Sequence, residues 1–191
     1  MSWYNLGLFL HLGCVVAAFW FAAQIHVGME RLWSADTSGQ ALQALDLTHS
    51  GARWMPWIGL ALLLTGAYLT QSRWNWALPW ISISIVGLIA LEGFGGASGK
   101  GRRKLRQRLQ GQPLNAPLAP EFVAAARGPL ARTVHFMLPL LTVGIMLVMV
   151  TKPGALGGVI ELVVAAAIGA AWGSRRSLSP RREPHEEIAR S

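Results

Sequence analysis

Long stretches without charge alternate along this chain with short segments that carry nearly all of its charged residues. No Asp, Glu, Lys or Arg occurs between Arg53 and Arg73, between Arg73 and Glu92, or between Arg132 and Lys152. Each gap is close to the roughly 20 apolar residues that a helix needs to cross a bilayer. The pattern predicts an all-α membrane protein, a bundle of five transmembrane helices at about 6–27, 54–70, 76–94, 130–150 and 156–173.

These spans leave no room for a separate soluble domain. Residues 1–174 are therefore expected to form a single transmembrane domain, in which a basic cytoplasmic link at 95–129 joins the third and fourth spans. The glycines from Gly93 to Gly101 are typical of a helix end followed by a flexible connection. Residues 175–191 are expected to be a basic, disordered tail in the cytoplasm.

Composition and charge support this assignment. Hydrophobic residues make up 52% of the chain and charged residues 14%, which is unlike an average soluble domain. The net charge of +8 comes mainly from residues 99–108 and 174–184. In a multispanning protein the positive-inside rule explains such clusters, so no nucleic-acid partner is expected. Placing both clusters in the cytoplasm puts the N-terminus outside and the C-terminus inside.

Polar side chains inside spans are costly and are therefore candidates for function. Sorted by depth, they form two groups. The outer group is His11, Cys14, Met146, Met149 and Glu161, and the inner group is His26, His49, Glu92, Arg132 and His135. Residues His135, Pro139, Thr142, Met146 and Met149 follow a helical spacing that predicts one seam facing the bundle.

These residue types allow a limited chemistry. Imidazole ligates haem iron, copper or zinc, and thioether suits haem iron or Cu(I). An outer haem would use His11 alone or with Met146 or Met149, whereas an inner haem would use His135 with His26 or His49. Candidate copper or other metal ligands are His11, Cys14, His26 and His49. No pattern for hydrolysis is present.

Structural interpretations compete with each of these assignments. His26 and His49 are typical of interfacial histidines that bind water or headgroups. Met146 and Met149 are typical apolar filler. Cys14 is the single cysteine, so the chain cannot form an internal disulfide. A lone cysteine in a span is most often a small, buried apolar residue.

The segments HLGCVVAAFWFAA (11–23) and LVMVTKPG (147–154), together with the basic link, resemble the CopD-like superfamily of small bacterial membrane proteins. That superfamily includes copper-resistance proteins and HemJ-type protoporphyrinogen oxidases. The resemblance implies a bacterial inner-membrane location and a b-type haem at His11, or metal handling. The HemJ-type enzymes carry a lysine early in helix three, and residues 74–87 contain none. This departure argues against protoporphyrinogen oxidation and is compatible with haem binding.

Three functional hypotheses follow. The first is a haem-binding protein of the inner membrane with a redox or haem-related role. Its expected partner is a membrane redox protein or a second copy of the same chain. The second is Cu(I) passage along His11, Cys14, Met146 and Met149. The third is an accessory subunit without a cofactor, for which small-residue stretches such as 165–173 would allow close helix contacts.

Overall fold

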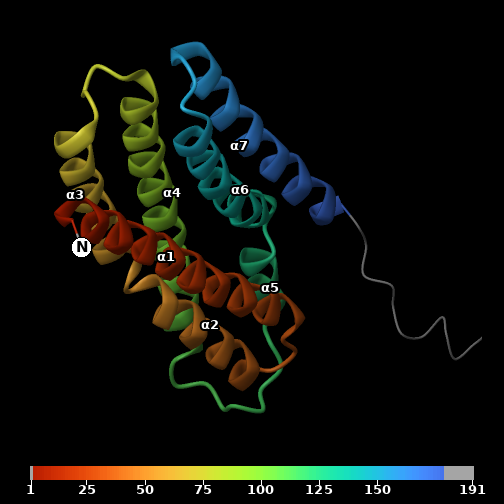
Figure 1. Cartoon of the computed structure of the whole chain (residues 1–191). Coiled ribbons are helices and arrows are strands. Elements are labelled where there is room, and N and C mark those ends of the chain that lie inside the picture. Colours follow the sequence, from red (N-terminus) through yellow and green to blue (C-terminus); the bar gives the residue numbers. More distant parts are fainter. Residues whose placement is uncertain (1, 179–191) are drawn as a thin grey trace, which may run out of the picture.

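The computed structural model describes residues 2–178, which form seven helices (Figure 1). The longer helices pack together into an elongated bundle. Residues 179–191, most of the predicted tail, lie outside the described part. The helices are α1 (Trp3–Ser34), α2 (Ser38–Ala52), α3 (Met55–Arg73), α4 (Pro79–Leu109), α5 (Pro120–Ala126), α6 (Pro129–Thr151) and α7 (Ala155–Leu178).

The all-helical prediction is confirmed for the described residues, and each of the five predicted spans falls largely within a helix, although residues 76–78 form a turn before α4. Four stretches are long and apolar enough to cross a membrane: Trp3–Ser34, Pro79–Leu109, Pro120–Thr151 and Ala155–Arg175. The remaining predicted span forms α3, a helix of 19 residues that is not among these four. Large apolar side chains such as Phe9, Val16 and Val150 are exposed along the bundle, as a lipid-facing surface requires.

The connections between helices gather at two opposite ends of the bundle. At one end, residues 36–39 after α1 form backbone hydrogen bonds with residues 114–118 before α5. At the other end, the turn before α4 meets the turn after α6, where the Lys152 ammonium lies 4.3 Å from the centre of the Trp74 ring. We refer to the first as the α2–α5 end. The basic residues 99–108 form the last turns of α4 at this end. The loop after the first predicted span and the basic link therefore lie at the same end of the bundle, as the predicted order of spans requires.

Three predicted irregular segments are helical in the structure. The expected loop between the first two spans contains the last turn of α1 and all of α2. The predicted helix end near Phe94 is wrong, because α4 continues through Gly93–Gly101 to Leu109. The link at 95–129 therefore holds the last turns of α4 as well as α5.

Most of the fully buried side chains lie at the α2–α5 end, and Val148 of α6 is an exception. A core cluster there joins α1, α2, α4 and α5 and consists of Met29, Leu32, Ala35, Ala41, Ala44, Leu45, Leu109, Phe122 and Ala126. A glycine on α1 allows α2 to approach closely. A Cβ atom at Gly28 of α1 would lie 2.6 Å from the Thr48 side chain of α2. This end is packed like a small soluble core, and it fixes the position of the last turns of α1.

Close backbone contact between α6 and α7 is the second tightly packed region. A Cβ atom at Gly169 would lie 2.6 Å from the Met137 Cα, and one at Gly173 would lie 2.7 Å from the Thr133 Cα. Backbone atoms cannot move aside as a flexible side chain can. Small residues are therefore required along this face of α7, as is common where membrane helices touch.

We predict that Gly169→Ala destabilises the protein and that Gly93→Ala does not. The added methyl group at Gly169 must push α6 and α7 apart, which costs about 1–3 kcal/mol of unfolding free energy. Gly93 is exposed within α4, and a methyl group added there would meet no atom within 4 Å. There the substitution should stabilise the helix by about 0.5–1 kcal/mol. Unfolding by SDS in mixed micelles measures the unfolding free energy of both variants. Equal changes in Gly169→Ala and Gly93→Ala would contradict the close packing of α6 against α7.

Candidate functional site

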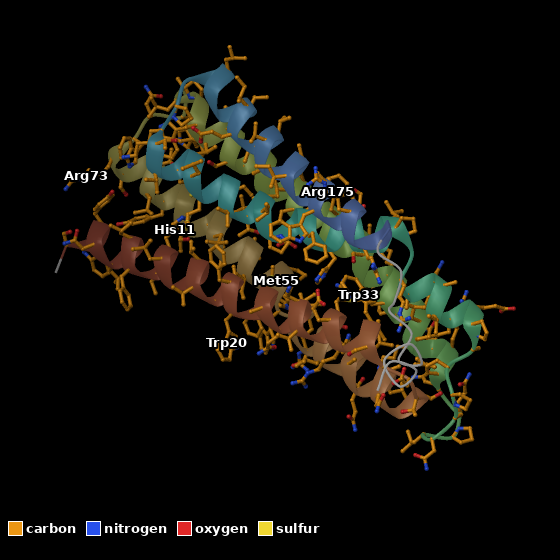
Figure 2. All side chains as sticks on the ribbon, turned by 90° about the vertical axis from the view of Figure 1, so that its right-hand side faces the viewer. His11, Trp20, Trp33, Met55, Arg73 and Arg175 are labelled. Atoms are coloured by element: carbon orange, nitrogen blue, oxygen red, sulfur yellow. The ribbon has the colours of Figure 1, made fainter. Side chains whose placement is uncertain are left out.

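His11 is a buried histidine in the half of α1 that lies away from the α2–α5 end. Only 8% of the residue is exposed. Its Nδ1 atom lies 2.9 Å from the Thr65 hydroxyl of α3, and the backbone of Gly66 passes next to the ring. Figure 2 shows His11 on the side of α1 that faces the other helices and Trp20 on the opposite side.

The Thr65 contact favours one tautomer of His11. The Thr65 hydroxyl lies 2.7 Å from the Ala61 carbonyl oxygen and 3.3 Å from the Leu62 carbonyl oxygen, and both can accept its single hydrogen. With the hydroxyl hydrogen on a carbonyl, the hydroxyl oxygen accepts a hydrogen bond from the N–H of Nδ1. That arrangement leaves the lone pair of Nε2 for a ligand.

An apolar groove runs along the contact between α1 and α3 beside this pair. Its volume is about 540 Å³, and it is lined by Trp3, Leu6, Gly7, Leu10, Leu64, Thr65 and Tyr68. Thr65 therefore both borders the groove and holds His11. The groove is open rather than enclosed, and His11 is not among its lining residues.

A second group of polar side chains meets at the opposite end of α1. His26 and Glu30 are four residues apart on one face of α1, and His135 faces them from α6. The Glu30 Oε1 atom lies 3.9 Å from His135 Nε2 and 4.0 Å from His26 Nε2. The two imidazole rings are stacked, with centroids 4.4 Å apart and planes 10° from parallel. We call these three residues the histidine–glutamate cluster.

Three ligand atoms of the histidine–glutamate cluster lie within 4.8 Å of one another. Among residues 2–178, no other group of three His, Cys, Asp or Glu side chains approaches so closely. The Oε1 atom of Glu30 and the Nε2 atom of His135 are both buried, and neither has a hydrogen-bond partner among the described residues. Buried polar atoms normally have such a partner. The cluster is therefore a place where a ligand or ion would satisfy unused bonding capacity.

Aromatic and cationic side chains surround the histidine–glutamate cluster. The Trp33 and Phe136 rings meet His135 edge-on, with centroids 4.8 and 5.1 Å away. The Trp33 indole N–H donates a hydrogen bond to the Ala126 carbonyl at 2.9 Å, which ties α1 to α5. The Arg132 guanidinium lies 5.3 Å from the centre of the Trp33 ring. These contacts restrict the orientation of His135.

The other predicted ligands do not join either group. His49 is exposed near the end of α2. Cys14 is half-buried on α1, one turn after His11. Met146 is 43% exposed and Met149 is half-buried, because the buried face of α6 consists of His135, Leu141, Gly144, Ile145 and Val148. The predicted seam from His135 to Met149 is therefore only partly directed into the bundle.

Sequence reasoning paired His135 with His26 as one possible inner site, and the structure brings these two together. It did not identify Glu30, Trp33 or Thr65 as parts of a site. The spacing of His26 and Glu30 could have indicated a shared helix face. Nothing in the sequence indicates that Thr65 lies next to His11, because 54 residues separate them.

We predict that Trp33→Phe destabilises the α2–α5 end. The substitution keeps an aromatic ring but leaves the Ala126 carbonyl without its donor, which costs about 1–3 kcal/mol. The control is Trp20→Phe, since Trp20 is 65% exposed on the outer side of α1. Unfolding in mixed micelles should show a loss for the first variant alone. An unchanged Trp33→Phe protein would mean that this hydrogen bond contributes nothing.

Comparisons of the chain with protein-family models, with curated proteins and with solved structures found no match.

Proposed function

We propose that the chain is a multi-pass protein of the bacterial cytoplasmic membrane that binds one b-type haem through His11 and serves a redox or haem-related role. The observation that carries this proposal is the buried His11 imidazole, whose Nδ1 atom lies 2.9 Å from the Thr65 hydroxyl. Haem iron takes its protein ligand from a neutral imidazole nitrogen with a free lone pair. The resemblance to the CopD-like superfamily, which includes a haem-associated histidine in helix one, supports the same residue.

The fit of His11 to haem rests on three features of this chain. The imidazole is almost fully buried, so a bound iron would be shielded from water. The second nitrogen of a metal-ligating histidine usually donates to an oxygen, which is the role of Thr65 here. Thr65, next to His11, also lines an open apolar groove between α1 and α3. When bound, the haem would supply one-electron chemistry.

A single protein ligand is expected for this haem. α1 packs mainly against α2 and α3, whereas α6 packs mainly against α7 and α4. Met146 and Met149 are therefore not held next to His11 by direct packing of their helices. His11 would therefore be the residue that holds the haem.

The proposed orientation is five crossings with the N-terminus outside. The α2–α5 end carries the basic residues 99–108 and corresponds to the cytoplasmic side under the positive-inside rule. α3 is the shortest of the five crossing helices, and its 19 residues cover about 28 Å at 1.5 Å per residue. That length is close to the roughly 30 Å of hydrocarbon that must be crossed.

We predict that the purified protein has a Soret band and that His11→Ala abolishes it. Thr65→Val should weaken haem binding by about 10–100-fold, as loss of an outer-shell hydrogen bond does, while Thr65→Ser should retain it. Met146→Leu with Met149→Leu should leave the spectrum unchanged. Absorption spectra of the oxidised and reduced protein in detergent measure all four variants, and the reduced wild type should bind carbon monoxide.

A colourless wild-type protein, expressed with ample haem, would contradict this proposal. Copper handling and the accessory-subunit role would then remain. Copper content measured on the purified protein would favour the first, and stable co-purification of a partner that survives His11→Ala would favour the second.

A further inference from the structure

We propose that the histidine–glutamate cluster is a second and separate site that binds one divalent first-row transition-metal ion of the Zn²⁺ or Fe²⁺ kind. His26 and Glu30 would supply two ligands from α1, and His135 would supply the third from α6. This site lies 15 residues from His11 along α1, or about 22 Å at 1.5 Å per residue. It does not depend on the haem proposal.

The separations between ligand atoms suit a single ion. Two ligands bound about 2.0–2.2 Å from one metal at a tetrahedral angle lie roughly 3.4 Å apart. The Glu30 carboxylate oxygen is 3.9 Å from one imidazole nitrogen and 4.0 Å from the other. Closing each of these two gaps to roughly 3.4 Å needs a movement of about half an ångström, which the flexible Glu30 side chain, 41% exposed, can make. The two imidazoles must also rotate, because their rings are stacked nearly parallel and their nitrogen lone pairs lie in the ring planes.

Two of the three ligand atoms also lack a hydrogen-bond partner. Oε1 of Glu30 and Nε2 of His135 are buried without a hydrogen bond to a described residue, although they face each other. A buried polar atom without such a partner is unfavourable. A bound cation would compensate the Glu30 charge and use the lone pairs of both imidazoles at once.

The ligand types and the ring geometry of the cluster favour Zn²⁺ or Fe²⁺ over Cu(I) and over haem. Two imidazoles and one carboxylate are the ligand set of zinc hydrolase sites and of non-haem iron sites, and three protein ligands leave a position open. Cu(I) prefers sulfur, which the cluster does not contain. A haem held by both histidines would need them on opposite faces of the ring, whereas these imidazoles are stacked 4.4 Å apart.

The site would connect two parts of the bundle that otherwise have few contacts. α1 belongs to a group with α2 and α3, and α6 belongs to a group with α4 and α7. Figure 1 shows the second group beside the first, with α5 between them at the lower end. An ion bound by residues of both groups would hold them together, so metal binding should raise the thermal stability of the protein.

The test uses the full-length protein with a tag that contains no histidine, stripped of metal in detergent. Equilibrium dialysis against Zn²⁺ measures stoichiometry and affinity, and the visible spectrum with Co²⁺ reports coordination by nitrogen and oxygen. We expect one ion per chain. Glu30→Gln and His135→Ala should each weaken binding by at least about 100-fold, because losing a direct ligand exceeds the roughly 10–100-fold effect of losing an outer-shell partner.

Matched variants separate this site from the alternatives. His49→Ala removes an exposed histidine on α2 and should leave the affinity unchanged. His11→Ala should abolish the Soret band without changing Zn²⁺ binding, so the two proposals fail or succeed separately. If His135→Ala does not fold, Glu30→Gln gives the same test with nearly unchanged shape. A wild-type protein that binds no more Zn²⁺ than Glu30→Gln would overturn the site and leave a simple ion pair.

Discussion

The absence of water from the hydrocarbon layer constrains every part of this structure. A backbone N–H or C=O group in lipid must find its partner within the protein, and helices provide one within a single segment. Polar side chains are subject to the same requirement. His11 meets it through Thr65, which in turn donates to the Ala61 carbonyl. The residues of the histidine–glutamate cluster do not meet it among the described residues, and this contrast motivates the metal site.

Both sites use residues of α1, and the length of this helix sets the distance between them. Its 32 residues cover about 48 Å, well beyond the roughly 30 Å of hydrocarbon. In the proposed orientation, His11 would lie at bilayer depth and His26 near the boundary. The core cluster at the α2–α5 end holds the last turns of α1, and the Trp33 indole joins them to α5. That packing positions Glu30 opposite His135, although α1 and α6 are not packed together over most of their length.

The helices could be predicted from sequence because the bilayer imposes a simple pattern, a run of apolar residues between charged ones. α2 could not, since its buried face is made of small residues such as Ala41 and Ala44 rather than a clear apolar stripe. The glycines of α4 also give a misleading signal in the sequence. Exposed glycine weakens a helix only slightly, and the basic residues that follow continue it as far as Leu109, which is fully buried.

The sites were only partly predictable, for a different reason. Each depends on contacts between distant segments, such as His11 with Thr65 or His26 with His135. The positions of His26 and His135 along their predicted spans correctly indicated that both lie at the same end of the bundle. It could not reveal that Met146 would face outward, because that depends on which face of α6 packs against α7.

Chemical rescue of haem binding tests the central claim, that His11 is the iron ligand, most directly. His11→Gly removes the imidazole and leaves space beside Thr65 for a free one. The account predicts a colourless variant whose Soret band returns when imidazole is added to haem-supplied protein, with no such return in His11→Gly combined with Thr65→Val at the same imidazole concentration. A His11→Gly protein that retains its haem without imidazole would contradict the account.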